Sequence, residues 1–349
     1  MPQGVAAVAP ALPMNIANQF QSGFTLFLSL LVEAFPFLLL GILLSSLLLL
    51  FINEQALIER MPRSPLLGAF VGSCIGFLFP VCECGNVPVA RRLLVQGLPA
   101  SVAIGFLLAA PTINPVVIWA TWIAFRDQPE IVVFRVLFSL AIATTVSWVF
   151  STQRDLRPFL QPTVTALMPR PQPTDAPVPA LLQSGTYLLG TPGQPVALET
   201  LPVAPVTSAP PQPWSQRLPL LLDNVVQEFR ELGGILVLGS LVAAVIQVAA
   251  PRELILSLGQ GPVISIVAMM ILGAVISICS TVDAFFALAF AATFTPGSLL
   301  AFLVLGPMVD LKSIGLLLTI FRPRALIYIF VLVAQLTFSL CLFLNLQWS

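Results

Sequence analysis

The sequence contains no histidine and very little charge. Only 9% of its 349 residues are charged, whereas soluble domains carry about 25%, and 58% are hydrophobic, with a mean hydropathy of +0.99. The absence of histidine removes imidazole as a metal ligand or proton shuttle. A net charge of zero gives no electrostatic basis for nucleic-acid binding. These values indicate a polytopic protein whose main partner is the lipid bilayer.

Cysteine is also scarce, and its spacing excludes the usual structural sites. Only two of the five cysteines are close in sequence, and all lie in apolar segments: Cys74, Cys82, Cys84, Cys279 and Cys341. This is not the pattern of a secreted disulfide framework. Without a histidine or a second cysteine pair, a structural zinc site is not expected. No Gly-x-x-x-x-Gly-Lys-Ser/Thr motif occurs, so we expect no ATP hydrolysis by this chain, and a separate ATPase subunit stays open. We also expect no enzyme activity and no cofactor.

Apolar runs and their interruptions divide the chain into two membrane halves and a linker. We expect a short tail at 1–22, a first membrane half at 23–150, a linker at 151–213 and a second half at 214–349. The linker holds 14 of the 32 prolines. A segment of that composition buries too little apolar surface to fold alone, so we expect a disordered spacer.

The two halves match each other at a fixed offset of 197 residues. The matched pairs are Pro65/Pro262, Gly76/Gly273, Cys82/Cys279, Cys84/Thr281, Asn86/Asp283, Pro99/Pro296 and Ser101/Ser298. After a deletion of one residue, the segment 111–114 matches 307–310. Internal repeats with helices broken at corresponding positions are typical of secondary transporters, whose binding site lies at the breaks.

The distribution of arginines favours an odd number of membrane crossings in each half, which makes the repeats inverted. With a hairpin or two complete spans at 66–96, eleven arginines fall on one side and three, Arg126, Arg135 and Arg252, on the other. A single crossing there would give seven on each side. Because cytoplasmic loops carry an excess of basic residues, we expect a membrane protein with a cytoplasmic linker and both termini outside.

The helical arms around residues 82–86 are short. At 1.5 Å per residue, residues 66–80 would extend about 22 Å and residues 87–96 about 15 Å, against a hydrocarbon core of about 30 Å. We therefore favour a re-entrant hairpin over two full spans. The expected fold is an all-α polytopic membrane protein of two inverted repeats, each with three full spans and one hairpin, and with helices broken at mid-membrane.

The stretch 82–86 (CECGN) places two thiols, a carboxylate and a carboxamide in apolar sequence. Unpaired polar groups cost several kcal/mol there, so we predict a hairpin tip that faces 279–283 of the other half. Thiolates select soft metals and metalloids, and Cys279 adds a third sulfur if the halves face each other. Two alternatives stay open: Cys82 and Cys84 are small buried apolar side chains, or they form a redox pair.

The other candidate residues lie in or beside the breaks. Glu83, Asp283 and Asp310 are expected to carry the coupling charge, and Glu33 either joins them or pairs with an arginine. The candidate substrate-binding residues are Cys82, Cys84, Asn86, Pro111, Thr112, Asn114, Cys279 and Thr281. For Asn114 and Asp310 the alternative is the capping of a broken helix. Arg91 and Arg92 form either a cytoplasmic anchor or an anion gate.

Three motifs resemble those of a known family. They are residues 79–85 (FPVCECG), 88–93 (PVARRL) and 110–115 (APTINP). They resemble the ArsP-like predicted permeases, the family that includes the organoarsenical efflux permeases. The resemblance covers both membrane halves but not the linker. It implies an inner-membrane permease, and in some members the export of trivalent arsenicals, which bind thiols.

We therefore expect a secondary transporter that exports a soft, thiol-reactive or metalloid-type small substrate with proton or cation coupling. Arsenical resistance is what the resemblance implies. The alternative is a membrane thiol-redox or sulfur-handling protein that uses Cys82 and Cys84. A channel is a third class, but the repeated breaks suit alternating access better. The sequence leaves a homo-oligomer open.

Overall fold

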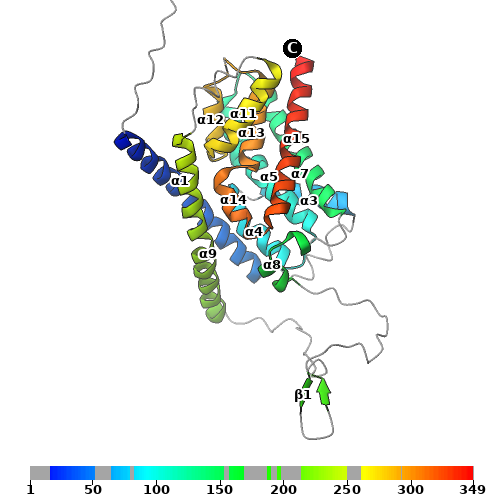
Figure 1. Ribbon diagram of the computed structural model, residues 1–349. Helices are drawn as coiled ribbons and strands as arrows, with labels where there is room; N and C mark the ends of the chain where they lie inside the picture. The colour runs from blue at the N-terminus through cyan, green and yellow to red at the C-terminus, as the bar shows by residue number, and fades with distance from the viewer. Residues whose placement is uncertain are drawn as a thin grey trace, which may run out of the picture.

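The computed structural model describes residues 16–51, 64–78, 82–152, 157–168, 187–189, 195–197, 214–249, 261–291 and 293–348. The first half contains α1 (Ile16–Phe51), α3 (Pro65–Ile75), η1 (Gly76–Leu78), α4 (Glu83–Val95), α5 (Ala100–Ile113), α6 (Pro115–Ala124) and α7 (Pro129–Ser151). The second half contains α9 (Trp214–Ala249), α11 (Pro262–Ile276), α12 (Asp283–Leu288), α13 (Pro296–Met308), α14 (Leu311–Leu317) and α15 (Pro323–Trp348). Figure 1 shows these helices gathered into one bundle.

Six segments of the described chain are long and apolar enough to cross a membrane, three in each half. They are Phe20–Leu47, Ala100–Ala124, Pro129–Ser151, Leu221–Val248, Pro296–Leu317 and Pro323–Gln347. Two shorter apolar helices, Pro65–Ile75 and Val263–Ile276, lie between the first and second span of each half. The prediction of a helical, polytopic membrane protein is confirmed.

The expected linker contains several short elements. Within 151–213 the structure describes η2 (Arg157–Phe159), α8 (Pro162–Leu167), and an antiparallel pair of strands, β1 (Tyr187–Leu189) and β2 (Pro195–Ala197). These strands are the departure from an all-α chain. The segment around α8 is bound to the turn between α14 and α15, because the Gln161 N–H donates to the Ile320 carbonyl at 2.8 Å and the Arg322 N–H to the Phe159 carbonyl at 2.8 Å. Most other residues of the expected spacer lie outside the described ranges.

A helix is broken at the corresponding position of each half. The Asn114 side chain caps α6 by accepting from the Val117 N–H at 2.9 Å, and the Asp310 side chain caps α14 by accepting from the Ser313 N–H at 2.7 Å. Both capping residues have extended backbone. For Asn114 the cause is Pro115, since a residue before proline is disfavoured in the helical region. The structure thus shows the capping considered for these two residues, and their role in substrate binding or coupling stays a prediction.

The same close contact between helices occurs in both halves. A Cβ at Gly76 would lie 2.9 Å from the Cα of Ala110, and a Cβ at Gly273 would lie 3.4 Å from the Cα of Gly306. Gly76 matches Gly273 in the 197-residue register, and Ala110 matches Gly306 after the deletion of one residue. Backbones approach this closely only where a side chain is small or absent. The repeat seen in the sequence thus has a counterpart in packing.

The long helices α1 and α9 lie side by side and run in opposite directions (Figure 1). α1 packs on α4, and α9 packs on α14. The contact between α1 and α4 is tight, because a Cβ on Gly41 would overlap the backbone of Gly85. Each long helix therefore supports the short helix that follows a break in the chain.

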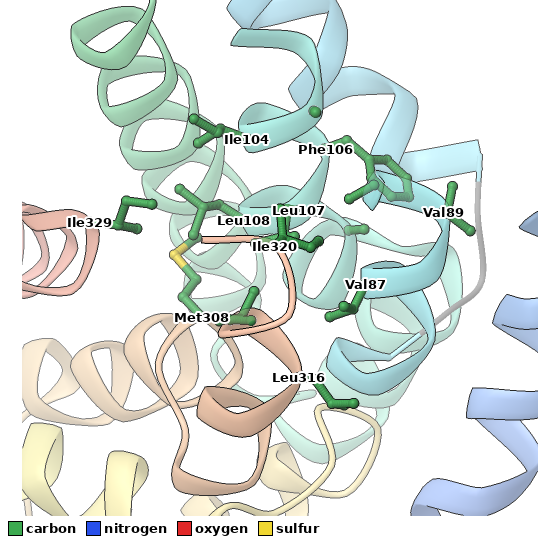
Figure 2. Close-up of a cluster of buried hydrophobic side chains, with 14 of the residues drawn as sticks. Val87, Val89, Ile104, Phe106, Leu107, Leu108, Met308, Leu316, Ile320 and Ile329 are labelled. Atoms are coloured by element: carbon green, nitrogen blue, oxygen red, sulfur yellow. The ribbon is translucent and has the colours of Figure 1, made fainter. Parts of the chain in front are cut away.

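One hydrophobic core joins the two halves. Figure 2 shows Val87 of α4 and Leu107 of α5 from the first half near Met308 of α13 and Leu316 of α14 from the second. All four side chains are buried. Burial of such side chains contributes about 1.5–3 kcal/mol each. The shared core brings the beginning of α4 close to the beginning of α14, which are in contact.

Candidate substrate site

Three potential ligand atoms from the two halves meet at one buried point. The thiols of Cys82 and Cys279 and a carboxylate oxygen of Glu83 all lie within 4.8 Å of one another. Cys82 is the N-cap of α4 and Glu83 is its first residue, whereas Cys279 lies in the irregular segment between α11 and α12. Because Cys82 and Cys279 match in the register of the repeat, equivalent residues of the two halves contact each other.

The segment that carries Cys279 begins with an unusual backbone. Helix α11 ends at Ile276 and is followed by its C-cap Ser277, whose φ of 50° is the only positive value at a non-glycine residue in the described chain. Such conformations cost about 1–3 kcal/mol and are found at functional sites. Here Ser277 binds the start of α14 twice: its carbonyl accepts from Lys312 Nζ at 3.2 Å and its hydroxyl accepts from the Leu311 N–H at 3.1 Å. The strained turn therefore fixes Lys312 beside the thiols.

Lys312 is the cation of this centre. It is the only lysine in the sequence, and its side chain is 1% exposed. Its Nζ lies 2.7 Å from Glu83 Oε1 and 4.0 Å from Asp310 Oδ2. Lys312 also interacts electrostatically with Cys84 and Cys279. An ammonium group, two carboxylates and thiols from both halves thus share one buried space.

Glu33 reaches the same centre from α1. Its carboxylate accepts hydrogen bonds from the backbone and the thiol of Cys279, and it interacts electrostatically with Lys312 and Glu83. The close packing of α1 on α4 holds this side chain in place. The centre therefore contains three carboxylates, those of Glu33, Glu83 and Asp310, around one lysine.

A second buried ion pair also joins the two halves. Arg135 of α7 binds Asp283 of α12 with two hydrogen bonds, Nη2 to Oδ2 at 2.6 Å and Nη1 to Oδ1 at 3.0 Å. The same Nη1 donates to the Thr121 hydroxyl at 2.8 Å. Such two-pronged pairs between arginine and carboxylate are the strong ones. Both oxygens of Asp283 are therefore occupied.

Arg135 corrects one expectation from the sequence. It was expected among the three arginines that flank the membrane on the side opposite the linker, but its side chain is 1% exposed and it lies within the span Pro129–Ser151. An arginine is tolerated at such a position because Asp283 neutralises it. Arg135 therefore no longer counts among the arginines expected to flank the membrane on that side.

Comparison with known proteins establishes the family. The family model described as "predicted permease" matches residues 19–346. The chain belongs to this predicted-permease family. The resemblance inferred from the three motifs is thereby confirmed, and the family indicates a membrane transporter rather than an enzyme.

Two relatives span nearly the whole permease. The UPF0718 protein YcgR of Bacillus subtilis is 33% identical over 320 residues, which cover 92% of this chain and 95% of that protein. A Streptococcus mutans protein named as a candidate subunit of a two-component membrane permease complex is 29% identical over 299 residues, 86% of this chain and 87% of that protein. No solved structure matches the chain.

Other candidate residues of the permease lie around this centre or along the broken helices. The Thr281 hydroxyl contacts the Cys279 sulfur at 3.5 Å, and Cys84 contacts Cys82. Asn86 donates to the Leu107 carbonyl at 2.8 Å, while its Oδ1 has no hydrogen-bond partner in the described chain. Pro111 and Thr112 are buried near the end of α5, and the Thr112 hydroxyl donates to the Ala109 carbonyl at 3.0 Å.

Arg91 and Arg92 of the permease lie toward the other end of α4. Arg91 Nη1 forms an ion pair with Glu231 of α9 at 2.9 Å, and both arginines interact electrostatically with Glu228. The side chain of Glu231 is 47% exposed. This pairing with the long helix α9 fits an anchor at the end of α4 better than a gate for anions.

Lys312 and Arg135 are the two residues that sequence reasoning missed. Lys312 carried a signal, since it is the only lysine in a chain that otherwise uses arginine. Lysine can give up its charge in a buried site, and arginine cannot. Arg135 lies inside an apolar span, where an ionisable residue is by itself a hypothesis of function or of a buried partner. Sequence alone did not reveal the partner of either residue.

Proposed function

We propose that this permease is a secondary transporter that exports a soft, thiol-reactive small substrate, which Cys82, Cys84 and Cys279 contact. The observation that carries this proposal is the meeting of the Cys82 and Cys279 thiols beside Glu83, with one thiol from each half. Thiolates are the ligands that select soft metals and metalloids. In a site built from both halves, movement of one half against the other changes both sulfur contacts together, as alternating access requires.

We also infer that the halves are inverted repeats, each with three full spans and a re-entrant hairpin. Three observations support this architecture: three long apolar segments per half, helices broken at Asn114 and Asp310, and the opposite directions of α1 and α9. Helix α4 has 13 residues. At 1.5 Å per residue it is about 20 Å long, which is shorter than a hydrocarbon core of about 30 Å. This length supports a hairpin that enters and leaves on one side.

The proposed orientation has the linker in the cytoplasm, because the linker side carries the excess of arginines. A protease site inserted near residue 175, within the expected spacer, tests this topology. We expect cleavage in inverted membrane vesicles and none in intact spheroplasts, because the linker faces the cytoplasm. A second protease site appended after Ser349 should show the opposite pattern. Cleavage of the linker in intact spheroplasts would contradict the proposed orientation.

Coupling is proposed to use the charges of the centre rather than the second ion pair. Glu33, Glu83 and Asp310 share the single ammonium group of Lys312. Such a set can accept protons or another cation and release them when the site opens to the other side. Asp283 is the weaker candidate for coupling, since Arg135 occupies both of its oxygens.

A thiol-redox function is the second candidate, and one contact favours it. The Cys82 thiol contacts the thiols of both Cys84 and Cys279, so two different disulfides are within reach. The two functions differ in what is consumed. A redox protein reduces an added disulfide and becomes oxidised itself, whereas a transporter accumulates an unchanged substrate.

Replacement of Cys82 and Cys84 together by serine tests the proposed function. We expect transport into inverted vesicles to fall to background for a panel of thiophilic metal ions and trivalent arsenicals, because serine is not a soft ligand. Cys341→Ser is the matched control: Cys341 is also fully buried, but it lies on α15 outside the site. Unchanged transport by the double variant at equal expression would refute the role of the thiols. Turnover of an external disulfide by the wild type would favour the redox function.

A further inference from the structure

We infer that the substrate binds as a thiophilic divalent cation, of the class of Zn²⁺ and Cd²⁺, and that Lys312 takes its place at Glu83 when the cation is absent. The ligands are the thiolates of Cys82 and Cys279 and the carboxylate of Glu83. This inference rests on the proposed function and narrows it, because it excludes neutral metalloids and anions as the primary substrates of the site.

The ligand atoms are positioned for one ion. The two sulfur atoms and the Glu83 oxygen lie within 4.8 Å of one another, and the three side chains are 1–3% exposed. Since metal–sulfur bonds of about 2.3 Å place two ligands of one ion about 4 Å apart, small side-chain shifts suffice. Glu83 Oε2 has no hydrogen-bond partner in the described chain. This buried carboxylate oxygen lies beside two thiols and is available to bind a metal ion.

The ligand types select the class of cation. Hard cations such as Ca²⁺ and Mg²⁺ are held by sets of oxygen ligands, whereas two thiolates with one carboxylate suit a borderline-soft ion. Binding forms two metal–sulfur bonds and one metal–oxygen bond and releases the two thiol protons to water. The two thiolates neutralise the two positive charges of the ion, so the buried centre gains no net charge.

The charge of the centre points to a cation rather than a neutral or anionic substrate. Three carboxylates face one ammonium group, and the nearby Arg135 is already paired with Asp283. An excess of negative charge in a buried space attracts cations and repels anions more strongly than it would in water. An oxyanion would have to enter against Glu33, Glu83 and Asp310 together.

Lys312 and the cation compete for the same carboxylate. Lys312 Nζ lies 2.7 Å from Glu83 Oε1, where a bound cation would also lie. The alternative partner is Asp310 Oδ2, 4.0 Å from Nζ and without a hydrogen-bond partner in the described chain. A shift of about 1 Å brings the ammonium group within hydrogen-bonding distance of Asp310. Cation binding thus moves Lys312 from Glu83 to Asp310, and cation release moves it back.

Equilibrium dialysis of the purified permease in detergent with Cd²⁺ tests this inference. We expect the wild type to bind one Cd²⁺ ion per chain, with Zn²⁺ competing and Mg²⁺ not. Cys279→Ser and Glu83→Gln should each weaken binding by roughly tenfold or more, as is usual when a metal site loses a ligand or its support. Cys341→Ser should bind as the wild type does. Lys312→Met should bind roughly tenfold more tightly, because the competing cation is gone.

Lys312→Met leaves Glu83 without its partner, and this variant can misfold for that reason. A double variant keeps the test informative in that case. Glu83→Gln combined with Lys312→Met removes both charges, so it should fold and should bind Cd²⁺ more weakly than the wild type. Tighter binding by this double variant, or equal binding by wild type and Glu83→Gln, would overturn the role of Glu83. If the wild type transports a neutral arsenical into vesicles but does not bind Cd²⁺, the substrate is not a divalent cation. That result would overturn this inference and would support the proposed transporter function. If neither binding nor transport is found, both proposals fail.

Discussion

Arg135→Met will destabilise the permease by about 3–5 kcal/mol, the usual cost of leaving one partner of a buried ion pair alone. Asp283 would keep a charge at 2% exposure with no other cation among its described contacts. The Thr121 hydroxyl would lose its donor as well. We expect a much smaller fraction of the protein to remain monodisperse in detergent after mild heating. Size-exclusion chromatography over a temperature series measures this fraction.

Two further variants separate charge from packing in this prediction. Arg135→Met combined with Asp283→Asn removes both charges and should recover most of the lost stability, since replacing a buried pair by neutral groups is often harmless. Arg91→Met breaks the more exposed pair with Glu231 and should cost less than about 1 kcal/mol. If Arg135→Met is no less stable than Arg91→Met, the pair with Asp283 does not hold the two halves together.

The protein class, the membrane spans and the helix breaks could be predicted from the sequence, because they depend on local composition. A run of apolar residues is long enough to cross a membrane or it is not, and Pro115 disfavours helix at Asn114 whatever surrounds it. The repeat added one long-range prediction, that 82–86 faces 279–283. The structure brings Cys82 and Cys279 together, as that prediction requires.

The ion pairs could not be predicted in the same way. Arg135 and Asp283 are 148 positions apart and do not match in the register of the repeat. Lys312 and Glu83 likewise come from different halves and from positions that do not correspond. The repeat specifies which backbone segments meet, but each half carries its own charges at those places. The pairs depend on side chains that are present in one half and absent from the matching position of the other.

The two ion pairs between the halves differ in how many oxygens of the carboxylate are bound. Arg135 binds both oxygens of Asp283 and a threonine hydroxyl, so both oxygens of its partner carboxylate are used, while its own Nε has no hydrogen-bond partner among the described residues. Lys312 contacts one oxygen of Glu83, and the second oxygen has no hydrogen-bond partner among the residues that the structure describes. A pair in which both carboxylate oxygens are bound suits a fixed contact between the halves, whereas a carboxylate with one unbound oxygen can exchange partners. This difference is the reason to expect that an arginine cannot replace Lys312 in transport.

Lys312→Arg is therefore expected to reduce transport to background while the protein remains folded. Arginine keeps the positive charge that Glu83 needs, so the stability of the centre should change little. Its planar guanidinium would bind both oxygens of Glu83 and would not withdraw to a single oxygen of Asp310 as an ammonium group can. The measurement is uptake of the thiophilic substrate into inverted vesicles, with the thermal midpoint in detergent as the test of folding. Arg324→Lys, the reverse exchange at an exposed position at the start of α15, is the control and should transport normally. Normal transport by Lys312→Arg would show that the lysine is a fixed counter-ion, because only a group that leaves Glu83 during the cycle needs to be a lysine.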